Sequence, residues 1–293
     1  MSRPPTFTPP PGVVARPLVT SRGTFATLDA APAGQLKGTA LLLPGFTGSK
    51  EDFIVLLPLL AAAGYRAVAV DGRGQYESEG PDDPAAYAME ELGRDVLAQA
   101  AALGDPPGTP LHLLGHSLGG LVSRTAVLLA PAGTFASLTL MSSGPGRVAP
   151  AQRTRATLLT DALAAHSMAA VWEMMRAVQP PEDADMAGAD GADGTDGALR
   201  ARWLRNNPVQ LIVTGRQLCV EPDRVDELAA VDIPRHVVSG ERDDTWPVPL
   251  LDDMARRLGA HRTVVTGAEH SPNTDRPEAT ATALVAFWDR TRR

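Results

Sequence analysis

Short apolar runs separated by turn-forming residues recur along most of this chain, which has 293 residues. The runs are shorter than most helices and do not alternate with polar residues, a pattern typical of strands that are buried on both faces of a parallel sheet. We expect such strands at Thr39–Leu43, Arg66–Val70, Leu111–Leu114, Ser137–Met141, Arg235–Val238 and Arg262–Val265.

Stretches with a helical spacing of apolar residues lie between these runs. Ser49 and Asp52 have the S-x-x-D spacing of a capping box, so we expect a helix from there to about Ala63. Further helices are expected at Ala85–Leu103, Leu118–Leu129 and Pro277–Arg290. Strands that alternate with helices predict an α/β fold, in which a mostly parallel central sheet is flanked by helices.

The alternation stops between residues 146 and 207. This stretch looks all-helical, with Arg153–Gln179 as its main helix. Gly, Ala and Asp dominate residues 180–198 and bury too little surface to order the chain, so we expect a mobile loop there. Prolines are frequent in residues 1–16, which we expect to form an irregular leader. The predicted organisation is therefore this leader, a core formed by residues 17–145 and 208–293, and a helical cap at 146–207.

Composition narrows the class of partner. The net charge is −7, whereas a nucleic-acid-binding domain needs a clustered basic face, so we expect no nucleic-acid partner. The longest apolar run, residues 53–64, is shorter than the roughly 20 residues of a membrane-spanning helix, so we expect no membrane span. A single cysteine, Cys219, and a proline-rich start unlike a signal peptide lead us to expect a cytoplasmic protein. The sequence carries no signal for an oligomeric state.

No metal or cofactor site is predicted. The Asp-rich stretch D-G-A-D-G-T-D-G lacks the spacing and the terminal Glu of a calcium-binding EF-hand loop. His112, His166, His236 and His261 lack the spacing and partners of a metal site.

The strongest chemical signal is G-H-S-L-G-G at residues 115–120, which follows a predicted strand and opens a predicted helix. This is the G-x-S-x-G pattern of a nucleophile elbow, whose glycines permit a tight turn that exposes a strained serine hydroxyl. The amino-terminal dipole of the helix favours a negative charge that develops beside the serine. Ser117 is therefore the candidate nucleophile.

A serine hydroxyl needs a base, and the base needs a third group to orient it. After a nucleophile elbow the expected chain order is serine, acid, histidine. His270 follows the last predicted strand, in G-A-E-H. The loop after the preceding strand reads G-E-R-D-D, where Asp243 is the favoured acid. Asp244 stays an alternative, because neighbouring loop residues point in different directions.

Two backbone N–H groups are needed to hold an oxyanion. One is expected from Leu118, the residue after the candidate nucleophile. The other is expected from Phe46 in the loop L-P-G-F-T-G after the first predicted strand, where Gly45 lets the backbone turn.

Together these segments resemble the α/β-hydrolase superfamily, in particular its capped serine esterase and lipase-like branch. The resemblance covers about residues 36–145 and 206–293. Pro44 and Tyr76 depart from the family pattern, which usually has His and Gly at these positions. Its anchors, in chain order, are P-G-F-T-G at 44–48, D-G-R-G-Q-Y-E-S at 71–78, G-H-S-L-G-G at 115–120, G-E-R-D and G-A-E-H.

The resemblance implies an α/β-hydrolase fold with a helical lid inserted after the sixth core strand, where residues 146–207 lie. Related haloalkane dehalogenases and epoxide hydrolases use an Asp nucleophile, so Ser117 argues against those chemistries. The first loop lacks the G-G-x-G run found in proline iminopeptidases, which argues against peptidase activity.

The expected substrate pocket includes His116 beside the nucleophile, Trp172 and Met174 from the cap, and Trp246 after the acid. Methionine-rich surfaces adapt to varied apolar ligands, which favours a hydrophobic acyl or alcohol group. An interpretation of at least equal weight is that the apolar cap residues only pack the cap onto the core.

The expected function is that of a serine hydrolase, which cleaves a carboxylic ester or related acyl bond of a small molecule through an acyl-enzyme. The same catalytic residues would also serve a lactonase, a thioesterase or a carbon–carbon bond hydrolase. An alternative of another class is a non-catalytic small-molecule receptor built on a hydrolase scaffold.

Overall fold

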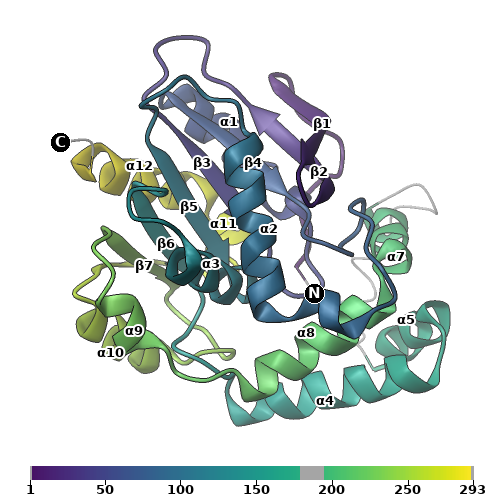
Figure 1. Ribbon diagram of the computed structural model, residues 1–293. Helices are drawn as coiled ribbons and strands as arrows, with labels where there is room; N and C mark the ends of the chain where they lie inside the picture. The colour runs from purple at the N-terminus through teal and green to yellow at the C-terminus, as the bar shows by residue number, and fades with distance from the viewer. Residues whose placement is uncertain (1, 179–194, 292–293) are drawn as a thin grey trace.

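The computed structural model describes residues 2–178 and 195–291. Its centre is one eight-stranded sheet with the strand order β1-β2-β4-β3-β5-β6-β7-β8 (Figure 1). The β1–β2 and β2–β4 pairs are antiparallel, and the other pairs are parallel. The strands are β1 (Val13–Thr20), β2 (Gly23–Ala30), β3 (Gly38–Leu43), β4 (Tyr65–Val70), β5 (Leu111–His116), β6 (Ser137–Met141), β7 (Arg235–Gly240) and β8 (His261–Val265).

The predicted mostly parallel α/β fold is confirmed, and each predicted strand is present. The sequence missed the antiparallel pair β1 and β2, and the predicted leader at residues 1–16 is wrong at its end, because β1 begins at Val13. Most side chains of β1 are exposed or half-buried. Pro17 also interrupts its pattern, which an edge strand tolerates because one side of its backbone has no partner strand.

Helices cover both faces of the sheet, and the strand residues alternate between them. Leu41 packs into the core on the side of α2 (Met89–Ala102) and α3 (Leu118–Leu129). Leu42 packs on the side of α1 (Leu56–Ala62) and α12 (Pro277–Thr291). In Figure 1, α2 and α3 lie in front of the sheet and α12 behind it. The remaining core helices are η1 (Lys50–Phe53), η2 (Pro84–Tyr87), α9 (Val225–Ala229), α10 (Val248–Leu258) and α11 (Pro272–Asp275).

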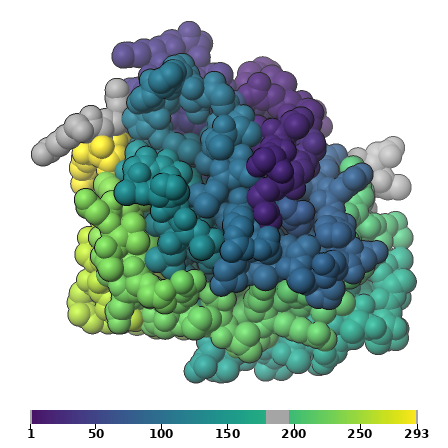
Figure 2. Space-filling model, viewed as in Figure 1, coloured from purple at the N-terminus to yellow at the C-terminus, as the bar shows by residue number. Residues whose placement is uncertain are grey.

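A helical insertion separates β6 from β7 and lies along the lower edge of the sheet in Figure 1. It contains α4 (Pro150–Ala165), α5 (Met168–Ala177), α7 (Thr195–Arg205) and α8 (Pro208–Val220). We call these four helices the cap. On the face shown in Figure 2, atoms of the cap (green) lie against those of the segment that follows β4 (blue), in agreement with the contact between α8 and η2.

The cap differs from its prediction in three ways. The single helix expected at Arg153–Gln179 is two helices: the backbone turns extended at His166, which ends the first, and the Ser167 side chain caps the second by accepting a hydrogen bond from the N–H of Ala170. The loop expected at 180–198 overlaps the start of α7, and its residues 180–194 lie outside the described residues. The predicted core segment at 208–293 begins with α8, which packs on α4 and contributes Leu211 to the apolar cluster of the cap.

A buried ion pair joins the cap to the core. Arg202 of α7 and Asp52 of η1 are each no more than 1% exposed at the side chain, and Nη1 of Arg202 lies 2.9 Å from Oδ1 of Asp52. The second carboxylate oxygen of Asp52 accepts hydrogen bonds from the Ser2 hydroxyl, at 2.6 Å, and from the N–H of Ser49, at 3.3 Å. Nη2 of Arg202 donates to the carbonyl oxygen of Ser2. The cap, the loop that precedes η1 and the amino-terminal segment therefore share one charged centre.

We predict that Arg202→Met lowers the free energy of unfolding by about 3–5 kcal/mol, because it leaves the Asp52 carboxylate buried and unpaired. Urea denaturation measures the loss. Arg200→Met is the matched control: Arg200 is on the same helix and half exposed, and among the described residues its one ion pair is a 3.9 Å contact with Glu173, so its loss should stay within about 0.5 kcal/mol. Equal losses for the two variants would contradict the prediction.

Candidate active site

Ser117 lies at the turn between β5 and α3 in a strained backbone conformation, with φ 54° and ψ −121°. Three glycines make this turn possible. A β-carbon at Gly115 would overlap the carbonyl group of Gly119, one at Gly119 would overlap the carbonyl oxygen of Leu43, and one at Gly120 would overlap the side chain of Ser143. The close packing of α3 against the ends of the strands thus forces the backbone of Ser117 into the left-handed region.

Three side chains from separate loops meet at this turn. Nε2 of His270 lies 3.1 Å from Oγ of Ser117, and Nδ1 of His270 lies 3.0 Å from each carboxylate oxygen of Asp243. The Asp243 side chain is fully buried, and it also accepts hydrogen bonds from the N–H groups of Thr245 and Trp246, at 2.9 and 3.1 Å. Because the carboxylate is fixed in this way, it can hold the imidazole ring in one orientation.

Asp244 points away from this group. Its side chain is 74% exposed, accepts a hydrogen bond from Nε2 of Gln152 at 2.9 Å, and lies 3.5 Å from Arg155. Of the two candidate acids, the structure brings Asp243 to His270.

The loop after β3 lies directly against the serine. A β-carbon placed on Gly45 would be 3.0 Å from the β-carbon of Ser117, so only glycine fits here without displacement. In the described part of the chain, the N–H groups of Phe46 and Leu118 donate no hydrogen bond to another residue. Both predicted donors therefore remain available beside Ser117, as an oxyanion site requires.

Segment 71–78 is hydrogen-bonded to the stretch from Gly45 to Lys50, which includes this loop. Nε2 of Gln75 donates to the carbonyl oxygen of Gly45 at 3.1 Å, and Asp71 accepts hydrogen bonds from the N–H and the ammonium group of Lys50. Tyr76 has φ 39°, a conformation that favours glycine, and the ammonium group of Lys50 lies 4.6 Å from the centre of its ring. The segment fixes the loop that carries Phe46, although its sequence departs from the family pattern at Tyr76.

His116 is a buried neighbour of the three side chains and has no contact that would make it their base. Its Nε2 lies 2.8 Å from the carbonyl oxygen of His270, which can only accept, so Nε2 carries the proton. Its Nδ1 has no hydrogen-bond partner among the described residues. Burial, together with the nearby His270, lowers the pKa of His116 to about 4.

A cavity of about 400 Å³ opens beside Ser117 and His270. One part of its wall is apolar, formed by residues of the loop after β3, the cap and the β6–α4 connection: Phe46, Val148, Ala156, Leu159, Met175, Trp203 and Leu218. The rest is polar and includes Ser2, Thr47, His116, Gln152, Arg155, Asp244, Thr245 and Ser271.

Of the residues expected in the pocket, only His116 lines this cavity. Trp172 is buried in the apolar cluster of the cap, and Met174 is 44% exposed on the outer side of α5. Trp246 is fully buried, and its ring N–H donates to the carbonyl oxygen of Gly146 at 2.9 Å. The sequence missed Met175, which helical spacing from the buried Val171 could have indicated, since residues four apart share a face.

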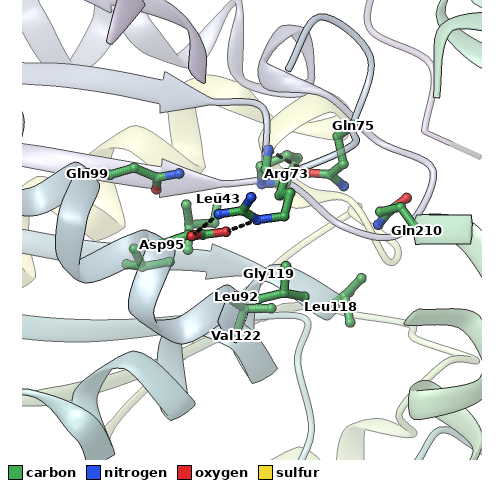
Figure 3. A pocket seen from close by; sticks show the side chains of 13 residues that line it. Leu43, Arg73, Gln75, Leu92, Asp95, Gln99, Leu118, Gly119, Val122 and Gln210 are labelled. Atoms are coloured by element: carbon green, nitrogen blue, oxygen red, sulfur yellow. Dashed lines mark hydrogen bonds and ion pairs between the residues drawn. The ribbon is translucent and has the colours of Figure 1, made fainter. Parts of the chain in front are cut away.

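Another, much smaller cavity is lined by Leu118 and Gly119 (Figure 3). Arg73 crosses it to reach Asp95, and Gln99 and Gln210 lie toward opposite sides of the view. Its volume of about 40 Å³ admits water but no ester. The cavity of about 400 Å³ is the candidate substrate site, because Ser117 and His270 line it.

Within residues 2–178 and 195–291, no three His, Cys, Asp or Glu side chains are arranged to hold a metal ion. No helix in these ranges is both long and apolar enough to cross a membrane.

The fold and the hydrogen-bonded side chains of Ser117, His270 and Asp243 point to one class of protein. The model of the alpha/beta hydrolase family matches residues 40–283, and the chain is a member of that family.

Two curated relatives share part of the sequence. "Putative carbamate hydrolase RutD" of Variovorax paradoxus is 39% identical over 111 residues, which is 38% of this chain and 40% of the relative. Epoxide hydrolase B of Mycobacterium tuberculosis is 34% identical over 116 residues, which is 39% of this chain and 32% of the relative. The chain thus matches less than half the length of each.

Solved structures match over nearly the whole chain at lower identity. A hydrolase from Pseudomonas aeruginosa has a TM-score of 0.73 at 24% identity, covering 93% of this chain and 97% of its own. An esterase from Exiguobacterium antarcticum has a TM-score of 0.73 at 18% identity, covering 94% of this chain and 100% of its own. These similarities show the shared fold.

We predict that His116 makes the protein less stable as the pH falls. The folded pKa of about 4 lies below the ordinary value of 6.5, so the unfolded chain binds a proton that the folded chain does not. The stability that neutral His116 provides is present above pH 6.5 and is lost as the pH falls toward 4. Between pH 7 and pH 5 it amounts to about 2 kcal/mol.

His116→Gln should remove this part of the pH dependence when urea midpoints are compared at pH 7 and pH 5. The matched control is His166→Gln, since His166 is exposed at the end of α4. An unchanged pH slope in His116→Gln would contradict the prediction.

Proposed function

We propose that this protein is a serine hydrolase that cleaves carboxylic esters or related acyl compounds through an acyl-enzyme. The observation that carries the proposal is the continuous hydrogen-bonded chain from Asp243 through His270 to Ser117, with two unengaged N–H groups beside the serine and a cavity in front of it. Each of these elements matches one requirement of acyl transfer by serine.

In the proposed reaction, Nε2 of His270 takes the proton from Ser117 as Oγ attacks the acyl carbon. The carbonyl oxygen becomes an oxyanion, which accepts hydrogen bonds from the N–H groups of Phe46 and Leu118. Asp243 stabilises the charged imidazole. His270 then gives its proton to the leaving alcohol, and the acyl group remains on Ser117. A water molecule, deprotonated by His270, releases the acid and restores the serine.

A serine nucleophile is compatible with carbamate hydrolysis but not with epoxide hydrolysis, the two reactions in the names of the relatives. A carbamate has a carbonyl carbon that a serine can attack, so carbamates belong in the substrate panel with esters, thioesters and lactones. An epoxide has no acyl carbon, and Ser117 stands where related epoxide hydrolases use Asp. We therefore do not propose epoxide hydrolysis.

The apolar part of the cavity suits a hydrophobic acyl group, because burial of each additional CH₂ is favourable by about 0.8 kcal/mol. The walls that Leu159, Met175 and Trp203 provide come from three different cap helices. The cap is thus proposed to define the acyl pocket, as well as to cover the core.

We predict that Ser117→Ala lowers kcat on p-nitrophenyl esters by at least about 10⁴-fold and abolishes labelling by a fluorophosphonate. Asp243→Asn should lower kcat by about 10⁴-fold, because His270 then loses its orientation. Asp226→Asn is the matched control, since Asp226 is 89% exposed and does not line the cavity, and it should change kcat by less than about threefold. Full esterase activity in Ser117→Ala would refute the proposal.

We also predict that kcat/KM rises from p-nitrophenyl acetate to p-nitrophenyl hexanoate, and that Leu159→Trp, which fills the apolar part of the cavity, reverses this order. Leu158→Trp is the control, since Leu158 is 65% exposed on the same helix and does not line the cavity. A wild-type preference for acetate over hexanoate would contradict the proposal of an apolar acyl pocket.

A further inference from the structure

One face of α4 forms a graded wall of the substrate cavity. Gln152, Arg155, Ala156 and Leu159 all line it, and their spacing places them on one side of the helix. The first two are polar, and the last two are apolar. The cavity therefore has a polar end, where α4 faces Asp244. Its other end is apolar and is formed by α4 together with the rest of the cap.

The polar end contains a charge pair that the proposed reaction does not use. Among the described residues that line the cavity, Arg155 is the one permanent cation and Asp244 the one carboxylate. Their closest atoms are 3.5 Å apart, and the two side chains are 70% and 74% exposed. A pair so exposed to solvent is weakly held, so a ligand can exchange with one of its members.

When the pair separates, Asp244 keeps another hydrogen-bond partner and Arg155 does not, among the described residues. Asp244 also accepts a hydrogen bond from Nε2 of Gln152 at 2.9 Å, so it retains a partner. Arg155 has no second acceptor among the described residues. Separation therefore leaves a guanidinium group at the wall of the cavity with its donors free, and such a group can bind a carboxylate in bidentate fashion.

The role of His270 indicates which half of an ester, acyl or alcohol, lies near the Arg155 guanidinium. The imidazole gives its proton to the leaving oxygen, so the leaving alcohol lies on the side of His270. The polar end is built from the loops that carry His270 and its acid, since Ser271 follows the first and Asp244 follows the second. The alcohol half of an ester would thus face the polar end while the acyl half faces the apolar end.

We propose that Arg155 determines specificity by binding a carboxylate on the alcohol half of the substrate, which displaces Asp244 from Arg155. The substrate class is then an ester of a hydroxy acid. This inference rests on the proposed function, because it concerns the same cavity and the same reaction.

The test compares two aryl acetates that differ only in charge, 4-acetoxybenzoate and 4-acetoxybenzamide. We expect a higher kcat/KM for the anionic ester. Arg155→Gln should lower the ratio of the two kcat/KM values by about tenfold or more, the size expected for a lost charge-assisted hydrogen bond. Asp244→Asn should raise the ratio, because the competing carboxylate is removed.

Arg216→Gln is the matched control, since Arg216 is an exposed arginine on cap helix α8 that does not line the cavity. It should leave the ratio unchanged. An unchanged ratio in Arg155→Gln, or a fall as large in Arg216→Gln, would overturn the proposal. A preference for a cationic ester that Asp244→Asn removes would also overturn it.

A binding measurement separates failure of this inference from failure of the proposed function. In Ser117→Ala, calorimetry should show tighter binding of 4-hydroxybenzoate than of 4-hydroxybenzamide, and Arg155→Gln should abolish the difference. If this difference appears while wild-type protein hydrolyses neither acetate, the anion site stands and the proposed function fails. If both acetates are hydrolysed but neither assay distinguishes the anion, the proposed function stands and the anion site fails.

Discussion

The left-handed backbone at Ser117 is the constraint on which the rest of the site depends. It exists because α3 begins in direct contact with the ends of β3 and β5, at a distance that only glycine permits at positions 115 and 119. Gly45, which precedes the proposed N–H donor Phe46, also lies directly against the serine. Since β3, β5, β7 and β8 are parallel, their carboxyl ends share one edge of the sheet, where the loops that follow them carry Phe46, Ser117, Asp243 and His270.

A second constraint is electrostatic and acts on the position of the cap. Asp52 contacts Arg202 of the cap and Ser2 of the amino-terminal segment, and its backbone carbonyl accepts a hydrogen bond from Asn273, three residues after His270. A buried ion pair adds little net stability compared with an apolar contact, because both charges lose their hydration. The pair does, however, restrict the position of α7 relative to η1, because both charges must stay within hydrogen-bond distance. We infer that Asp52 and Arg202 fix where the cap lies over the cavity more than they stabilise the fold.

The sequence predicted what is encoded locally and missed what depends on packing. The inner strands and the elbow were predictable, because apolar runs and glycine spacing reflect burial and backbone conformation directly. Strands β1 and β2 were missed; β1 is the edge strand of the sheet, and most of its side chains are exposed or half-buried, so its sequence forms no continuous apolar run. The choice of Met175 over Met174 and of Asp243 over Asp244 depends on which way each side chain points, which only the packed cap and loop determine. Tyr76 shows the same limit, since its strained φ is held by its neighbours.

The most direct measurement of the central claim is detection of the acyl-enzyme. Wild-type protein mixed with p-nitrophenyl hexanoate and quenched in acid within one turnover should carry one hexanoyl group, located by peptide mass spectrometry on Ser117. The fraction acylated should rise with the burst of p-nitrophenol and decay at the rate of steady-state turnover. Hydrolysis without any adduct, or with an adduct on another residue, would contradict the claim that Ser117 is the nucleophile.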